Sequence, residues 1–272
     1  MNFFKYKDDF IGFTPDTYGP AHIVLLIVTF SFMIAMMFFF FRKKDNEWVT
    51  KFLKVMSIIV FVNEATYITW EAIECNMHGH AFNFDTSLPL YTCSLFIYCL
   101  IPAAWAKGKV QESCLAFLTT IGIFAGATGV FTVNGFKSFP IFTYGALYSY
   151  FFHYSMLFIG IAILVSKYYT VSVKSAFLSF IPILILSIIV IPVNYALKGD
   201  YMLLYAGIGA PLMPSLAEYF ASLHLRGIYT VIMLISYIPI ALLVVGIDKG
   251  VGYLFNLLTN RNDHIEKAKQ GA

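Results

Sequence analysis

Cys93 and His153 are the two residues of this chain whose side chains are best suited to chemistry in an apolar environment. A thiol becomes a nucleophile when a neighbouring base takes its proton, and imidazole is a common base. Brought together by helix packing, the pair would form a minimal acyl-transfer centre, in which sulfur attacks a carbonyl carbon and an acyl-thioester forms. A purely structural role for both residues stays open, because buried cysteines are usually inert and intramembrane histidines are often only hydrogen-bonded to a neighbouring helix.

The composition shows where such chemistry would take place. Of 272 residues, 59% are hydrophobic and 12% charged, against about 25% charged in soluble domains. A soluble fold of this size has too much surface to hide so many apolar side chains, whereas a bilayer can cover them. The net charge of +3 is small and is not gathered into a basic face, so we expect no nucleic-acid partner.

The elements that position the pair are expected to be transmembrane helices, since each apolar run approaches the roughly 20 residues needed to cross the hydrocarbon. We predict an all-α fold, a polytopic integral membrane helix bundle of seven spans in a single domain over residues 1–272. The first residues lack the apolar core of a cleavable signal, so the first span would direct insertion. The spans are expected at about 19–41, 51–73, 88–106, 112–133, 145–166, 173–197 and 227–247.

The distribution of lysine and arginine predicts the orientation. Thirteen of them fall in the connections after spans 1, 3 and 5, in the first turn of span 2 and in the C-terminal tail, and five fall on the opposite side. Because cytoplasmic segments are enriched in these residues, the N-terminus is expected outside and the C-terminus inside. We therefore expect a multi-pass protein of the cell membrane.

Polar residues from five predicted spans share one level in the outer half of the membrane, where each requires a partner or a function. At ~1.5 Å per residue, Cys93 lies about 8 Å and His153 about 12 Å into their spans. For Glu71, Asp200 and His22 the alternative is that a residue near a span end simply reaches the interface. The supporting or substrate-binding candidates are His22, Glu64, Glu71, Thr92, Asn194, Asp200 and Tyr201.

The segment LPLYTCSLFIY, Leu88 to Tyr98, resembles a motif of the YwaF-like bacterial integral membrane proteins, which carry LPLHLC at this place. The likeness continues with FFHYSML around His153 and with Asn194 followed by Gly199-Asp200-Tyr201, and an early histidine corresponds to His22. Two departures stand out: Tyr91 replaces the usual histidine and Asp200 the usual asparagine.

The YwaF-like family is similar to the transmembrane protein 164 family, acyltransferases that remodel ether phospholipids. The resemblance implies a Cys93 nucleophile and a His153 acid/base, with a membrane phospholipid or lysophospholipid as substrate and no cofactor. Transfer to another lipid and hydrolysis by water both stay open.

Two other interpretations remain. A transporter or ligand-binding membrane protein with an outward-facing polar cavity would also gather polar residues in its spans, and Pro182, Pro192 and Pro239 are of the kind that break transporter helices. A loop carrying Cys75, His78, His80 and Asp85 has zinc-ligand residue types, but its spacing matches no standard site. We predict a solvated loop and no metal.

Overall fold

The computed structural model describes residues 3–4, 18–79, 82–84, 87–132, 139–208 and 212–270, with side chains as far as Tyr253. Within these residues the regular structure is helical throughout and contains no strand, which confirms the predicted all-α class. The helices are α1 (Pro20–Phe39), η2 (Phe41–Lys43), α2 (Asn46–Met77), α3 (Leu95–Trp105), α4 (Gly108–Thr119), α5 (Ile121–Phe131), α6 (Tyr144–Val165), α7 (Val173–Leu178), α8 (Phe180–Leu197), η4 (Tyr201–Leu203), α9 (Met213–Ser222) and α10 (Arg226–Gln270).

Six helical segments of the described chain are long and apolar enough to cross a membrane, namely Pro20–Lys43, Asn46–Met77, Gly108–Phe131, Tyr144–Val165, Val173–Leu197 and Arg226–Tyr253. They correspond to six of the seven predicted spans. The remaining one, expected over 88–106, is the shorter apolar helix α3, Leu95–Trp105. The chain is thus a multi-spanning helical protein, while seven crossings and their orientation stay predictions.

Two predicted spans are each built from two helices that meet at a break. One lies at Thr120 between α4 and α5, and the other at Ser179 between α7 and α8. At the second break Pro182 has no N–H to donate to the carbonyl of Leu178, four residues earlier. The Ser113 hydroxyl of α4 donates to that carbonyl instead, at 2.9 Å.

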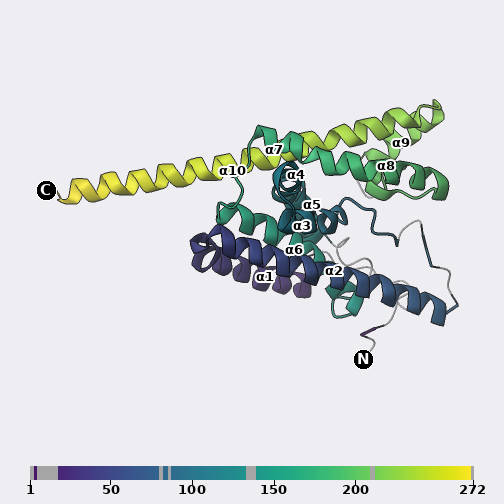
Figure 1. Cartoon of the computed structure of the whole chain (residues 1–272), viewed down its shortest axis with the longest axis horizontal. Helices are drawn as coiled ribbons and strands as arrows, with labels where there is room; N and C mark the ends of the chain where they lie inside the picture. Colours follow the sequence, from purple (N-terminus) through teal and green to yellow (C-terminus); the bar gives the residue numbers. More distant parts are fainter. Residues whose placement is uncertain are drawn as a thin grey trace.

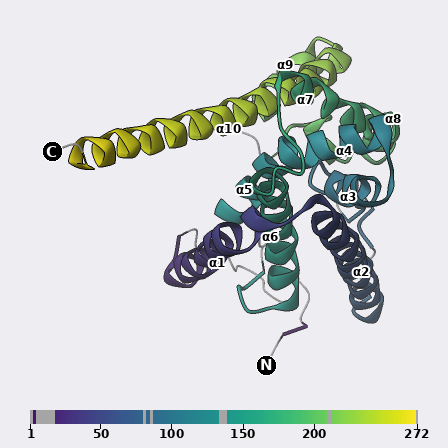
Figure 2. The same cartoon turned by 60° about the vertical axis from the view of Figure 1, so that its left-hand side comes forward.

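Helices α5 and α6 approach so closely that their backbones touch. A Cβ at Gly126 of α5 would lie 2.7 Å from the Leu157 nitrogen of α6. One at Gly160 of α6 would lie 2.6 Å from the Leu118 carbonyl oxygen, which belongs to the neighbouring helix α4. Glycine at such positions lets helix backbones meet, as in membrane helix pairs generally. Helix α6 consequently forms the centre of the bundle, and in Figure 2 it lies between α1 and α2.

Side chains that face outward are mostly large and apolar, as expected where lipid replaces water. Examples are Ile27 and Ile34 on α1, Ile58 on α2 and Ile188 on α8, which is 73% exposed. A soluble monomer rarely leaves apolar surface of this extent uncovered. The exposed faces therefore agree with a membrane-embedded bundle.

One end of the bundle, here called the basic end, gathers the lysine-bearing connections. Thr50 of α2 bonds the Tyr168 hydroxyl at 3.0 Å, and Lys174 pairs with Glu112 at 2.8 Å. These contacts bring the starts of α2, α4 and α7 to the same end as the residues that follow α6. The lysines that predicted a cytoplasmic face are therefore collected at one end.

The segment between α8 and α10 contains η4 and the short helix α9. Helix α9 begins at Met213, with Leu212 at its N-cap. Proline at the second helical position, Pro214, suits this start because its missing N–H has no partner there anyway. Helix α10 then runs back past the bundle and projects beyond it in both views (Figures 1 and 2).

Candidate functional site

The residues before α3 form a turn rather than the beginning of a helix. Pro89 disfavours helical geometry at Leu88, and Leu90 N–H bonds the Leu88 carbonyl at 2.8 Å. Cys93 therefore lies in the turn that leads into α3, not about 8 Å inside a helix as expected. Its carbonyl accepts the Phe96 N–H at 2.9 Å, so Cys93 lies one tight turn ahead of Phe96.

Tyr201, fully buried, fixes this turn. Its hydroxyl accepts the Leu88 N–H at 2.9 Å and donates to the Phe84 carbonyl at 2.8 Å. Its ring meets that of Tyr91 edge-on, with centroids 4.8 Å apart. Asn194 in turn holds the Tyr201 backbone, because its amide oxygen accepts the Tyr201 N–H at 2.9 Å and its amide nitrogen donates to the Tyr201 carbonyl at 2.8 Å.

Thr92 connects the same turn to α10. Its hydroxyl lies 2.5 Å from that of Tyr237, which donates to the Met202 carbonyl at 3.1 Å. Since the single Tyr237 proton goes to Met202, Thr92 is the donor between the two hydroxyls. The half-buried Cys93 thiol is within electrostatic reach of the Tyr237 hydroxyl.

Asp200 organises the loop that follows η4. One carboxylate oxygen accepts the N–H groups of Tyr205 at 3.0 Å and Ala206 at 2.8 Å, and the other accepts that of Ile208 at 2.6 Å. These three charge-assisted hydrogen bonds hold the backbone of the loop against the carboxylate. Asp200 therefore shapes the loop beside Tyr201. Its side chain is bound within the protein, in contrast to the alternative that it simply extends to the membrane interface.

The two candidate glutamates of α2, Glu64 and Glu71, also have protein partners. Glu64 accepts a hydrogen bond from the Tyr148 hydroxyl of α6, and the Tyr148 ring stacks on Tyr67 at 3.7 Å. Glu71, only 5% exposed, accepts the Ser87 hydroxyl at 3.1 Å. Glu71 is thereby tied to the beginning of the turn that carries Cys93, and Glu64 to the helix that carries His153.

His22 lies apart from this turn. It is fully buried, and its Nε2 lies 3.0 Å from the Val130 carbonyl at the end of α5, while its Nδ1 accepts the Tyr18 N–H at 3.2 Å. Nε2 therefore carries the hydrogen, because a carbonyl only accepts. These contacts give His22 a structural role in joining α1 to α5.

His153 is oriented by its own helix and by α5. Its Nδ1 lies 2.8 Å from the Ser149 carbonyl, so Nδ1 carries the hydrogen and in the neutral ring Nε2 carries the lone pair. Its ring rests on Gly129, where an added Cβ would fall 2.0 Å from the His153 Cδ2. A side chain at position 129 would thus displace the imidazole.

The segments that carry Cys93 and His153 meet through aromatic neighbours. The rings of Phe96 and Phe152 lie 5.6 Å apart and nearly perpendicular. Phe96 follows Cys93 by one tight turn, and Phe152 directly precedes His153. The structure thus brings Thr92, Asn194 and Tyr201 into one hydrogen-bonded group around the Cys93 turn, with Asp200 beside it, and the Phe96–Phe152 contact joins this turn to α6.

Sequence reasoning missed two participants, Tyr148 and Tyr237. Both are tyrosines inside apolar helices, and a buried tyrosine usually needs a hydrogen-bond partner for its hydroxyl. That requirement could have identified both tyrosines as residues with a polar partner in the bundle. Which partner each would find, Glu64 or Thr92, depended on helix packing that no local pattern reveals.

The residues considered as zinc ligands are only partly described. His80 and Asp85 lie outside the described residues, and His78 pairs with Glu74 at 3.3 Å. Cys75 is buried at the end of α2. Among the described residues no cluster of three or more metal-ligating side chains occurs.

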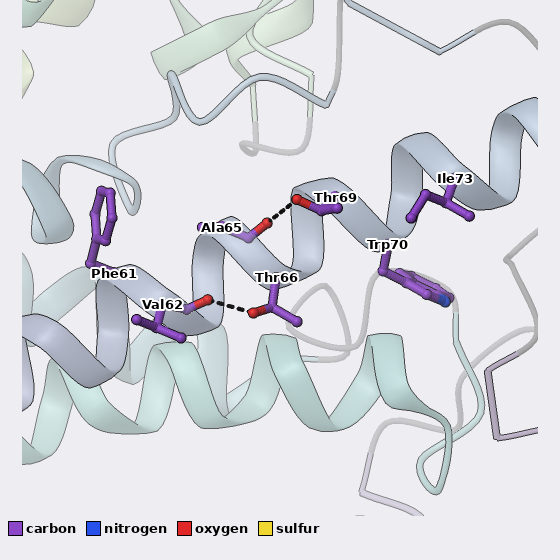
Figure 3. A pocket seen from close by; sticks show the side chains of 7 residues that line it. All are labelled: Phe61, Val62, Ala65, Thr66, Thr69, Trp70 and Ile73. Carbon is purple, nitrogen blue, oxygen red and sulfur yellow. Dashed lines mark hydrogen bonds between the residues drawn. The ribbon is translucent and has the colours of Figure 1, made fainter.

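Two hollows lie outside this region. One, of about 440 Å³, runs along α2, and its lining residues, from Phe61 to Ile73, all belong to that helix (Figure 3). Thr66 and Thr69 donate to the Val62 and Ala65 carbonyls of their own helix, so they offer it no free donor (Figure 3). The other, of about 610 Å³, lies between α3, α4 and α8 and reaches Leu90, three residues before Cys93.

The fold defines the chain as a multi-spanning helical membrane protein. Its bundle is apolar, and hydrogen-bonded polar side chains gather around one turn. Residues 17–248 match the family model described as the TMEM164 family, and the chain belongs to this family. Membership points to a function connected with membrane lipids. No curated protein and no solved structure matches the chain. The closer likeness to YwaF-like bacterial proteins stays a prediction.

Proposed function

We propose that this protein transfers or hydrolyses an acyl group of a membrane phospholipid or lysophospholipid, with Cys93 as nucleophile and His153 as general acid/base. The observation that carries the proposal is the set of polar contacts around the Cys93 turn, made by Tyr201, Asn194 and Tyr237 in an otherwise apolar bundle. Such contacts fix the backbone beside a half-buried thiol. Membership of the TMEM164 family supports a lipid substrate.

The proposed reaction uses the histidine tautomer inferred above. His153 Nε2 takes the thiol proton, and the sulfur attacks the ester carbonyl carbon of the lipid. The carbon–oxygen bond then breaks, the leaving alcohol takes the proton from the imidazolium, and an acyl-thioester remains on Cys93. A hydroxyl of a second lipid, or water, then attacks the thioester and gives its proton to His153. The carbon–sulfur bond breaks, the new ester or the free fatty acid leaves, and the imidazolium returns the proton to the Cys93 thiolate.

The other candidate residues act by positioning in this proposal. Thr92 donates its hydroxyl hydrogen to Tyr237, and Asn194 uses its amide oxygen and one amide N–H to hold the Tyr201 backbone. We assign both to holding the turn, together with Tyr201 and Asp200. Glu64 and Glu71 link the turn and α6 to α2.

The test is a search for the intermediate. The purified protein in vesicles containing a phospholipid with an isotope-labelled acyl chain should gain the mass of that chain at Cys93, and hydroxylamine should remove it. Cys93→Ala should abolish both the adduct and turnover. Cys99→Ala is the matched control, because Cys99 is a buried thiol of α3 with no assigned role, and it should retain both. An adduct that persists in Cys93→Ala contradicts the assignment.

The role of His153 needs a separate variant. His153→Gln keeps a side chain of similar size and should abolish lipid turnover while the protein still folds and inserts. Circular dichroism and thermal unfolding would establish that the variant is folded. Full activity of the folded His153→Gln protein would show that the imidazole is not the acid/base.

Transport remains a second candidate, because the breaks at Thr120 and Ser179 and the prolines inside α8 and α10 resemble the interrupted helices of transporters. Substrate uptake into vesicles that survives Cys93→Ala would favour it. For either function we place the protein in the cell membrane, with the basic end facing the cytoplasm.

A further inference from the structure

Apart from Lys109, the polar side chains that line the cavity between α3, α4 and α8 have partners within the protein. The Tyr98 hydroxyl donates to the Pro89 carbonyl at 3.0 Å, and the Ser113 hydroxyl donates to the Leu178 carbonyl at 2.9 Å. The Cys99 and Cys114 thiols, which also line it, lie beside each other. The two hydroxyls already have partners in the protein, so away from Lys109 the cavity offers its occupant a largely apolar surface.

The shape of the cavity suits a chain rather than a compact molecule. On α3 it follows one face, with Leu95, Cys99 and Pro102 at intervals of three or four residues, over about 10 Å of helix. On α8 it follows Ile181, Ile185 and Ile189 in the same way. Ile185 is 62% exposed, so this wall stands open to the acyl chains of the bilayer.

A single charged residue, Lys109, lines the cavity, and it lies at the basic end. The side chain is exposed, and no carboxylate of the described residues pairs with it. The headgroup level at this end is marked by Trp105, whose indole N–H bonds Ser57 at 3.1 Å and whose ring lies 4.7 Å from the Lys54 ammonium. Tryptophan and lysine typically occupy the membrane interface.

A molecule that matches this cavity has an apolar chain for the walls of α3 and α8 and one negatively charged group for Lys109. We propose that the cavity between α3, α4 and α8 binds one anionic phospholipid from the leaflet at the basic end, with an acyl chain along α3 and α8 and its phosphate against Lys109. The cavity meets the Cys93 turn at Leu90, but the proposal does not depend on the acyl chemistry proposed there. The lipid would cover the open wall between α3 and α8.

The test measures which lipid stays with the protein. The full chain is purified in detergent with equal amounts of phosphatidylglycerol and phosphatidylcholine, and native mass spectrometry records the lipids retained. One phosphatidylglycerol should be retained in preference to phosphatidylcholine. Lys109→Ala should lower that preference by roughly fivefold, the effect of one lysine near an anionic headgroup.

Two further variants separate the headgroup from the chain. Lys51→Ala is the matched control, because Lys51 also lies at the basic end but does not line the cavity. This variant should prefer phosphatidylglycerol over phosphatidylcholine as strongly as the parent protein does. Ile185→Trp should fill the open side and reduce retention of either lipid. Inclusion of phosphatidylglycerol should also slow labelling of Cys99 and Cys114 by a membrane-permeant maleimide.

Three results would overturn the proposal. If Lys109→Ala and the parent protein retain phosphatidylglycerol equally, Lys109 does not bind the headgroup. If Ile185→Trp retains as much lipid as the parent protein, the acyl chain does not lie along α8. Inorganic phosphate that protects the two thiols as well as the lipid does would show a phosphate site without a chain. Thermal unfolding of each variant confirms that the folded protein is compared.

Discussion

The rings of Phe96 and Phe152 lie 5.6 Å apart at an angle of 88°, and this edge-to-face contact joins the first turn of α3 to the middle of α6. Both side chains are buried. The contact matters because each ring is close in sequence to one of the two residues proposed to react. It is the described link between the Cys93 turn and the helix of His153.

Removing this contact should loosen the two segments. An aromatic pair contributes about 0.5–1.5 kcal/mol beyond the area it buries, so Phe96→Leu and Phe152→Leu together should show a coupling of about 1 kcal/mol in a double-mutant cycle of thermal unfolding. Lipid turnover should fall in both single variants. Strictly additive effects on unfolding would mean that the two rings do not support each other.

Gly129 is predicted to be intolerant of any side chain. A Cβ there would lie 2.0 Å from the His153 ring, so Gly129→Ala should displace the imidazole and remove most of the lipid turnover. Gly246→Ala, on α10, is the matched control, because no atom lies within 4 Å of its added Cβ. The control should be as active as the parent and equally or slightly more stable, since alanine favours helix over glycine by about 0.5–1 kcal/mol.

Asn194 and Tyr201 are expected to affect stability and activity differently. Asn194→Ala removes the acceptor of the buried Tyr201 N–H, at a cost of about 1–3 kcal/mol, and should lower the unfolding temperature clearly, whereas the Tyr201 carbonyl keeps the Leu204 N–H as a donor. Tyr201→Phe removes only the hydroxyl that holds Leu88 and Phe84, so it should reduce turnover more than stability. Equal losses of both properties in the two variants would contradict this division.

The hydrogen bond from Ser113 to the Leu178 carbonyl compensates for the N–H that Pro182 lacks. Ser113→Ala should therefore destabilise the protein by about 1–3 kcal/mol, because it removes the hydroxyl donor of the partly buried Leu178 carbonyl. Pro182→Ala restores the N–H and should largely rescue Ser113→Ala when the two are combined. Unfolding temperatures of both single variants and the double variant measure this, and the absence of rescue would show that the serine acts in another way.

The sequence determined the class of the protein and most of its helices. Long apolar runs with few charges require lipid, and six of the predicted segments are helices long and apolar enough to cross it. Lysine placement also predicted which connections belong together, and the contacts of Thr50 with Tyr168 and of Lys174 with Glu112 gather them at one end. Hydropathy and charge are properties of short segments, so the membrane-spanning helices and their charged connections can be predicted from the sequence alone.

Tertiary structure decided how the polar residues are used. Sequence reasoning selected Thr92, Asn194 and Tyr201, but only packing showed that Tyr201 holds the turn before α3 and that Tyr237 bonds Thr92. It also moved the start of α3 to Leu95, because Pro89 and the hydrogen bond from Leu88 to Tyr201 keep the preceding residues out of the helix. The reason is physical: a polar side chain in lipid must find a partner, but the helix that supplies the partner lies far away in sequence.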